Sequence, residues 1–289
     1  MQTAINNENI NNTVYSNYTV NTKVNEIRLL FSSPKLHDKI LVIIEGTTDK
    51  IYKYLLDDKK VYIKANNSCD GLISLITILN KDFSDLIIVL KDADFDNLNN
   101  VSYKEYGNIF LTDTHDIETM MLSSENVECK LSMEFLSGSE RGFINNCITK
   151  LDALSYMKWF NMTNHINLIT KDIKMGNLFD GNSKISLNDC ESEMFKNPKN
   201  QERCPNLLNE VQSFMKTHKT QDKWNLVNGH DLCNALAIYF QKKGSKSGNV
   251  SQCIRMAYLM VDFNQTKLYR QLTQWEITHN REIMNRNCI

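Results

Sequence analysis

The chain has 289 residues and a formal net charge of -1, from 33 basic and 34 acidic side chains. This balance excludes a protein that coats nucleic acid through its overall charge, although a local basic groove would not show in the sum. Hydrophobic residues make up 42%, enough for a folded core, and no apolar run approaches the ~20 residues that span a bilayer. We therefore expect one or two globular domains and no membrane segment.

The eight cysteines are scattered along the chain, and none forms a CxxC pair or a zinc-binding spacing. Scattered thiols in a chain of this length indicate a reducing compartment. The N-terminus is polar and does not resemble a signal peptide. These features predict a cytoplasmic location with buried, inert thiols.

Residues 1–37 are predicted to form an N-terminal arm, because residues 1–25 are rich in asparagine and poor in apolar side chains. A short element is expected near residues 27–31. Pro34 should break the chain before the first strand.

Residues 38–125 are predicted to form an α/β core. Strands are expected at residues 40–44, 61–63, 86–90 and 109–111, where apolar and β-branched runs are short. Two helices should lie between them, one following Thr47 or Thr48 and one running from Asp70 to Asn80. Strands that alternate with helices predict a parallel sheet with flanking helices.

Residues 126–289 are predicted to be mainly helical. The apolar spacing favours helices over residues 120–136, 144–160, 205–218, 231–242, 250–261 and 267–285. Pro205 and Asp231 should stand at the start of two of them. Residues 171–204 contain Gly176, Gly181 and Pro198 among polar residues and are expected to form a long loop or insertion.

Three of the predicted strands end on acidic residues: Glu45 after the first, then Asp92, Asp94 and Asp96, then Asp113, Asp116 and Glu118. The carboxyl ends of parallel strands form the ligand crevice of open α/β sheets. Clustered carboxylates repel each other and usually need a cation between them. The central hypothesis is therefore a divalent-metal site.

Each of these residues also has a structural interpretation. Glu45 could face solvent, and Asp92-Ala93-Asp94 could be an acidic turn. Asp116 and Glu118 could cap a helix, and a single histidine such as His115 is more often structural than catalytic. The metal site is favoured because the alternative requires every one of these structural interpretations to hold independently at the same crevice.

Two pairs of motifs carry a resemblance. Glu45-Gly46 and Asp92-Ala93-Asp94, in this order on alternating elements, resemble the Toprim fold over roughly residues 38–122. The segments HDIE at 115–118 and NGHDLCNALA at 228–237 resemble the AriB family, the Toprim effectors of PARIS anti-phage defence systems. Many relatives have a glycine soon after the DxD motif, where this chain has Asp96-Asn97-Leu98.

The resemblance implies that Glu45 is the catalytic acid or base and that Asp92 and Asp94 bind Mg²⁺ or Mn²⁺. Glu118 would complete a second metal position. The other candidate residues are Asp96 and Asp116 as further metal ligands, and Lys91 and Asp231 as substrate contacts. His115 is a candidate proton shuttle or ligand, and His230 a candidate RNA contact or proton shuttle.

The implied activity is metal-dependent cleavage of host transfer RNA by a toxin. An AriA-like ATPase would hold the toxin inactive, and the released protein would form a homodimer. Two alternatives remain open at this point: a Mg²⁺-dependent DNA nuclease of the overcoming-lysogenisation-defect type, and a non-catalytic metal-binding subunit.

Overall fold

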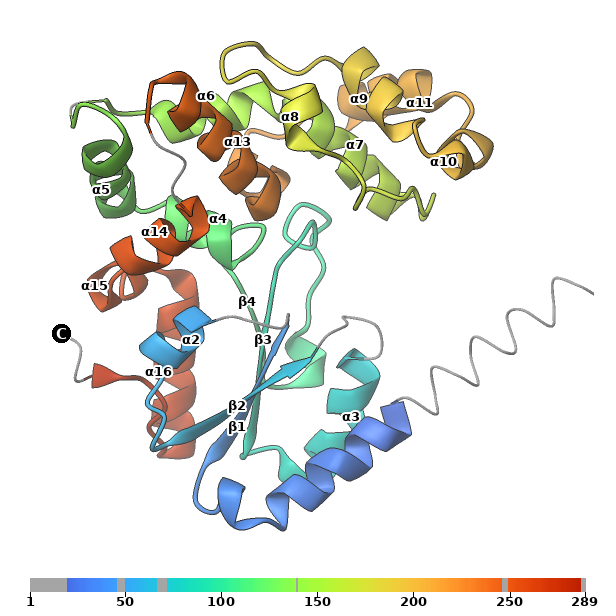
Figure 1. The fold of residues 1–289 in the computed structure, drawn as a ribbon. Coiled ribbons are helices and arrows are strands. Elements are labelled where there is room, and N and C mark those ends of the chain that lie inside the picture. Colours follow the sequence, from blue (N-terminus) through green and yellow to red (C-terminus); the bar gives the residue numbers. More distant parts are fainter. Residues whose placement is uncertain (1–19, 46–49, 67–71, 139, 246–248, 287–289) are drawn as a thin grey trace, which may run out of the picture. The chain divides into compact units, whose positions relative to one another are not determined.

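The computed structural model describes residues 20–45, 50–66, 72–138, 140–245 and 249–286 (Figure 1). The chain divides into two compact units. The first comprises Met1–Lys91, Ser102–Leu111 and Asn264–Ile289, and the second comprises Asp92–Val101 and Thr112–Phe263. Both units are discontinuous, because the chain leaves the first unit after Lys91 and again after Leu111. The regions predicted from the sequence, with boundaries at residues 37 and 125, were each one continuous stretch of chain.

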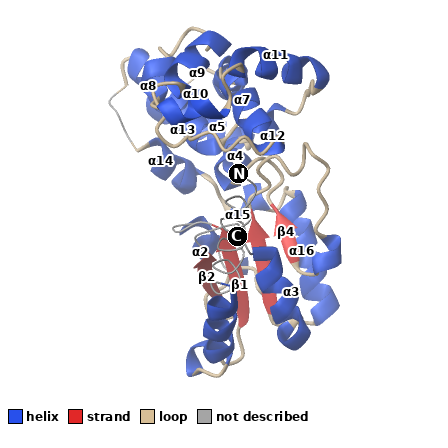
Figure 2. Cartoon of the chain, turned by 90° about the vertical axis from the view of Figure 1, so that its right-hand side faces the viewer, coloured by secondary structure: helices blue, strands red, loops and turns tan. Residues whose placement is uncertain are grey.

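The first unit contains a sheet of four parallel strands in the order β2-β1-β3-β4. Its strands are β1 (Ile40–Glu45), β2 (Val61–Asn66), β3 (Ile87–Lys91) and β4 (Ile109–Leu111). Figure 2 shows them side by side. The predicted α/β class with a parallel sheet is therefore confirmed. The two central strands are buried along their apolar runs, as expected for strands covered on both faces.

One face of the sheet packs against the helix of residues 20–31 and against α3 (Leu72–Phe83). Ile27 and Leu75 contribute to this core together with Ile43 of β1. Leu75 belongs to a stripe of four buried residues on α3, which is why this segment forms an amphipathic helix. In Figure 1, α2 (Lys50–Leu55) and α16 (Lys267–His279) lie on the other side of the sheet.

The C-terminal segment joins the first unit through α16. The expected helix over 267–285 is too long, because α16 ends at His279, and Asn280 adopts the left-handed conformation with φ of 50°. The chain beyond turns back, where the buried carboxylate of Glu276 accepts the N–H groups of Ile283 and Met284 at 2.7 and 2.9 Å. These two backbone groups then need no helical partner.

The second unit is helical. Its helices are α4 (Ile117–Leu122), α5 (Glu125–Phe135), α6 (Phe143–Lys150), α7 (Asp152–Thr163), α8 (Met175–Leu178), α9 (Leu187–Met194), α10 (Pro198–Arg203), α11 (Leu207–Thr217), α12 (Lys223–Leu226), α13 (Gly229–Lys242), α14 (Val250–Ala257) and α15 (Met260–Phe263). α13 packs against α4, α6, α8 and α14. The mainly helical character predicted for this half is confirmed.

Three predicted helices are broken in the structure. The helix expected over 120–136 is divided into α4 and α5, because Ser124 caps α5 and its hydroxyl also donates to Asp262 at 2.6 Å. The helix expected over 144–160 is divided at Leu151 into α6 and α7. The one expected over 250–261 is divided into α14 and α15.

The loop predicted for residues 171–204 is wrong, since this segment contains α8, α9 and α10. Local caps explain these short helices. Ser186 forms a capping box with Asp189 at the start of α9, and Asn197 caps α10 ahead of Pro198. The polar composition of this segment was interpreted as a loop. The side chains that cap its helices are themselves polar, so they did not stand out in the sequence.

Two predicted helix starts are corrected. α13 begins at Gly229 with Asn228 as its cap, not at Asp231, and Asp231 donates its N–H to that cap. α11 begins at Leu207, so Pro205 lies before it. The caps expected at Thr47, Thr48 and Asp70 lie outside the described residues. No helix in the described ranges is long and apolar enough to cross a membrane.

Candidate functional site

In the first unit, Glu45 and Lys91 stand at the carboxyl ends of the two central strands, β1 and β3. Glu45 Oε2 lies 4.0 Å from Lys91 Nζ, and the two side chains are 14% and 8% exposed. The Lys91 ammonium also lies 5.6 Å from the ring centroid of Tyr103, a cation–π arrangement. A buried lysine paired with a carboxylate at this edge places opposite charges where α/β sheets bind ligands.

In the second unit, Asp92-Ala93-Asp94 leads into a turn, which the Asp96 N–H closes by donating to the Ala93 carbonyl at 2.7 Å. Asp94 has a φ of 47°, in the left-handed region that non-glycine residues seldom adopt. Its N–H donates to the His115 carbonyl at 2.6 Å, and the Ala93 N–H donates to Thr112 Oγ1 at 2.9 Å. Asp92 Oδ1 accepts the Ile117 N–H at 3.3 Å. The turn is therefore fixed by the segment 112–117.

His115 is the centre of this arrangement. Its backbone N–H donates to the Trp224 carbonyl at 3.1 Å. Its ring packs edge-on against the Phe95 ring, with centroids 4.8 Å apart. Nδ1 lies 3.4 Å from Asp116 Oδ2 and 4.0 Å from Asp94 Oδ1. The side chain is only 3% exposed, and its proposed role as a proton shuttle or ligand stays a prediction.

Asp116 is a buried carboxylate that holds two helices. It caps α4, accepting the Thr119 N–H at 2.8 Å and the Thr119 hydroxyl at 3.0 Å on Oδ1. Its Oδ2 accepts the Gly229 N–H at the start of α13, at 2.6 Å. Burial alone would raise the pKa of Asp116, but the His115 ring and the N–H groups of Thr119 and Gly229 outweigh it and lower that pKa. Asp116 is therefore held ionised.

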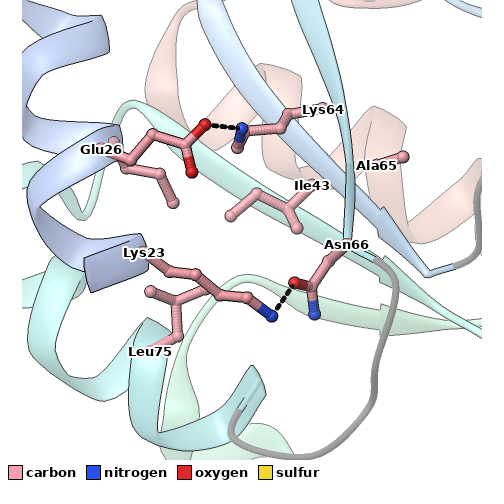
Figure 3. Close-up of a pocket in the computed structure, with 8 residues that line it drawn as sticks. Lys23, Glu26, Ile43, Lys64, Ala65, Asn66 and Leu75 are labelled. Carbon is pink, nitrogen blue, oxygen red and sulfur yellow. Dashed lines mark hydrogen bonds and ion pairs between the residues drawn. The ribbon is translucent and has the colours of Figure 1, made fainter. Parts of the chain in front are cut away.

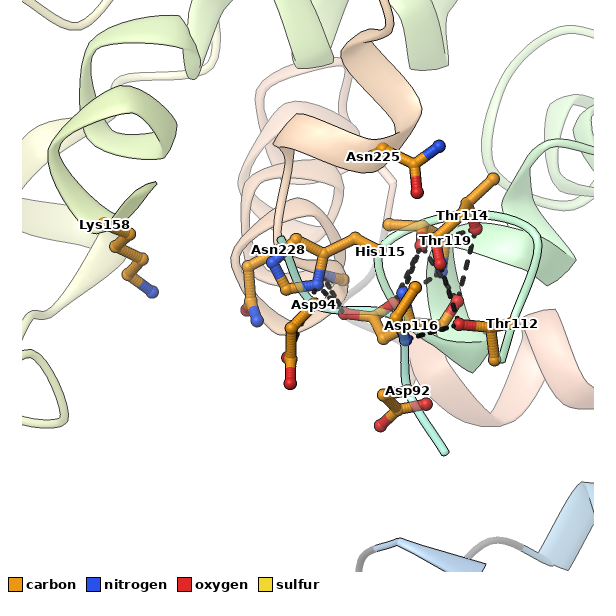
Figure 4. Close-up of polar contacts among 12 residues, drawn as sticks. Asp92, Asp94, Thr112, Thr114, His115, Asp116, Thr119, Lys158, Asn225 and Asn228 are labelled. Carbon is orange, nitrogen blue, oxygen red and sulfur yellow. Dashed lines mark hydrogen bonds and ion pairs between the residues drawn. The ribbon is translucent and has the colours of Figure 1, made fainter. Parts of the chain in front are cut away.

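The HDIE and NGHD segments meet at this carboxylate (Figure 4). A Cβ atom at Gly229 would lie 2.2 Å from Asp116 Oδ1 and 2.6 Å from Glu118 Cβ. Only glycine therefore permits the approach of α13 to α4. Both segments were singled out from the sequence by a resemblance, and the structure brings them together at Asp116.

The remaining residues of NGHD differ in environment. His230 is exposed on the first turn of α13. Asp231 Oδ2 pairs with Lys158 Nζ of α7 at 2.6 Å, and the side chains are 14% and 17% exposed. Asp231 thus ties α13 to α7, whereas His230 is the member of the motif that can meet another molecule.

The other predicted metal ligands lie within the same unit. Asp96 is buried, and its backbone closes the turn, with its N–H donating to Ala93 and its carbonyl accepting from Val101. Glu118 is half-buried in the first turn of α4. Burial and the charges of Glu118 and Asp116 raise the pKa of Cys233 to about 12, so this thiol stays protonated.

Sequence analysis missed three residues that build the turn: Thr112, Trp224 and Asn225. The Thr112 hydroxyl donates to the Thr114 carbonyl at 2.7 Å while accepting from Ala93. Asn225 Oδ1 accepts from Asn97 at 2.7 Å. Trp224 and Asn225 lie more than a hundred positions after the turn, and no local pattern marks them.

The predicted metal ligands of this unit differ in exposure. The Asp94 side chain is 33% exposed and Asp92 is half-buried, whereas Asp116 is almost fully buried. Carboxylate oxygens are the donors that hard divalent cations prefer. Across the ranges that the structure describes, no three His, Cys, Asp or Glu side chains form a group that could hold a metal ion.

No protein-family model matches the chain, and no curated protein matches it either.

Proposed function

We propose that this protein is a metal-dependent endonuclease of the Toprim type that cleaves RNA, with transfer RNA as the expected substrate. The observation that supports it most directly is the Asp92-Ala93-Asp94 turn. Asp94 adopts a left-handed backbone, a conformation that costs about 1 kcal/mol in a non-glycine residue, and a set of buried hydrogen bonds maintains it. Backbone strain of this kind concentrates at functional sites.

Asp92 and Asp94 are the residues that would hold Mg²⁺ or Mn²⁺, since Mg²⁺ is usually bound through one or two carboxylates together with substrate phosphates. Such an ion supplies an activated water and offsets negative charge on the phosphate. The chain's own contribution is to fix both carboxylates through the His115 and Ile117 backbones. Glu118 is the candidate for a second position.

Glu45 is the proposed general acid or base. Its carboxylate stands at a strand end, with Oε2 4.0 Å from the buried ammonium of Lys91. An ionised carboxylate can accept a proton from the attacking group. Lys91 is the proposed contact to a substrate phosphate, because its charge is held at the same edge.

An unrestrained ribonuclease would kill its host, so we further propose that an AriA-like ATPase holds the protein inactive in the cytoplasm. The released form would be a homodimer. Co-purification with such an ATPase before, but not after, the trigger is the expected result. A chain that is fully toxic beside the ATPase and never co-purifies with it would refute restraint by binding.

The deciding experiment incubates purified protein with Mg²⁺ or Mn²⁺ and either labelled transfer RNA or plasmid DNA. We expect transfer RNA to be cut, and Glu45→Gln to lower the rate by about 10²–10⁴-fold while the circular dichroism spectrum is unchanged. Glu105→Gln, at an exposed glutamate of the same unit, is the matched control and should cleave normally.

Cleavage of DNA alone would support the DNA nuclease instead. Metal binding without cleavage of either substrate would support the non-catalytic subunit. Full activity in folded Glu45→Gln protein would refute the role assigned to this residue.

A further inference from the structure

A pocket of about 230 Å³ lies in the first unit, between the helix of residues 20–31, β1, β2 and α3 (Figure 3). Its floor is apolar and formed by the buried side chains of Ile27, Ile43 and Leu75. Its rim is polar and formed by Lys23, Glu26, Lys64 and Asn66. An apolar floor beneath a few polar groups is the usual composition of a small-molecule site.

The pocket opens on the same sheet face as the proposed catalytic carboxylate. Ile43 and Glu45 are two positions apart on β1, so their side chains point to the same face. In the parallel register, Ile43 pairs with Lys64 and Glu45 pairs with Asn66. A molecule that rests on Ile43 and contacts Asn66 is therefore one strand away from Glu45, at the carboxyl edge of the sheet.

The charges at the rim are unequal. The Lys64 ammonium pairs with the Glu26 carboxylate at 2.6 Å, so these two charges offset each other. The Lys23 ammonium donates to Asn66 Oδ1 at 2.8 Å, which is an uncharged acceptor. The four rim side chains therefore carry one net positive charge, and an incoming anion would give Lys23 a stronger, charge-assisted partner.

We propose that this pocket binds one nucleotide of the substrate strand, with its phosphate on Lys23 and its base on the floor of Ile27, Ile43 and Leu75. The proposal rests on the proposed nuclease function and extends it to a binding subsite beside Glu45. An apolar surface accepts the face of any base, and Asn66 holds Lys23 at the edge of that surface. The Lys23 ammonium at the rim supplies the positive charge that the phosphate of a nucleotide requires.

The test measures nucleotide binding without catalysis. Adenosine and uridine 5′-monophosphate are titrated into the full chain in chelator-treated buffer and followed by calorimetry or NMR. Lys23→Met should weaken binding about tenfold or more, because it removes a charge-assisted contact. Lys81→Met, at an exposed lysine of α3, is the matched control and should leave binding unchanged.

Glu26→Gln provides a test of opposite sign. It removes a negative charge from the rim and releases Lys64, so nucleotide binding should become several-fold tighter at low salt, and the gain should shrink as salt is added. A variant that merely damaged the fold would not bind more tightly.

Three results would overturn the pocket: neither nucleotide binds, Lys23→Met binds like wild type, or inorganic phosphate alone binds as well as the nucleotides. If the protein cleaves RNA but Lys23→Met keeps the wild-type KM, the nuclease proposal is supported and the pocket proposal is refuted. If Lys23-dependent nucleotide binding occurs but neither RNA nor DNA is cleaved with Mg²⁺ or Mn²⁺, the pocket is supported and the nuclease proposal is refuted.

Discussion

Asp94 and Asp116 both place a carboxylate oxygen near Nδ1 of His115, at 4.0 and 3.4 Å. The Asp116 side chain is 7% exposed, and it accepts three hydrogen bonds from Thr119 and Gly229. The Asp94 side chain is 33% exposed, and the bond that fixes this residue comes from its backbone. In Figure 4, Asp94 and Asp92 project away from the network around Asp116.

The difference distinguishes a structural carboxylate from the one that is proposed to bind a cation. A carboxylate surrounded by N–H donors is stabilised in its ionised form and has little capacity for another ligand. The Asp94 carboxylate lies in the more exposed part of the cluster, which is where the proposed cation would bind. Asp116 therefore builds the scaffold, and Asp94 is the residue to which we assign the proposed cation.

The largest effect is expected from Gly229→Ala, which would destroy the contact between the two helices. The added Cβ would lie 2.2 Å from Asp116 Oδ1, a separation that requires α13 or α4 to move. We expect a loss of about 3 kcal/mol or more in the free energy of unfolding. Denaturant unfolding measures it. Gly176→Ala is the matched control, because nothing lies within 4 Å of its added Cβ, and wild-type-like unfolding of Gly229→Ala would refute the assigned approach.

Asp116→Asn should come next, at about 2–3 kcal/mol near neutral pH, because an amide would point a donor at one of the N–H groups. The pKa of Asp116 is lowered in the folded state, so its contribution is complete above its ordinary pKa and is lost as the pH falls through the folded value. The stability gap to wild type should therefore be constant from pH 5 to 8 and close below about pH 4. A gap that widened in acid would contradict this role.

Asp94→Asn tests the comparison between Asp94 and Asp116 through metal binding. The substitution leaves the backbone bond to His115 intact and relieves repulsion among carboxylates, so the apo protein should be as stable as wild type or slightly more stable. The rise in Tm on adding Mg²⁺ should be smaller than for wild type, and the same holds for Asp92→Asn. Thermal melts with and without Mg²⁺ measure both. An unchanged rise in both variants would place the metal elsewhere.

The contrast between the two aspartates could not be predicted from sequence, although the strands could. The apolar runs of β1 and β3 end at Glu45 and Lys91 and identify a parallel sheet directly. The burial of Asp116 depends on Gly229, which lies 113 positions later. A carboxylate in a local motif can therefore also accept a hydrogen bond from a helix that lies far along the chain.

The same limit explains the broken helices. Ser123 and Ser124 are compatible with a continuous helix, and the Ser124 hydroxyl that caps α5 also donates to Asp262, 138 positions away. The left-handed backbone of Asp94 has the same origin, because its partner is the carbonyl of His115. Local propensity is overridden where a distant residue supplies the stabilising contact.

The smallest effect on stability is expected from His230→Ala. Its neighbours in the motif have structural contacts, since Gly229 donates to Asp116 and Asp231 pairs with Lys158, whereas His230 is exposed on the first turn of α13. Removing an exposed side chain should change the free energy of unfolding by less than about 0.5 kcal/mol. If His230 meets the substrate, KM for RNA should rise several-fold while kcat changes little, and if it moves a proton, kcat should fall with KM unchanged. Steady-state cleavage kinetics separate the two. Normal values of both constants would leave the NGHD segment with packing as its task, and His230 would then be excluded from the site.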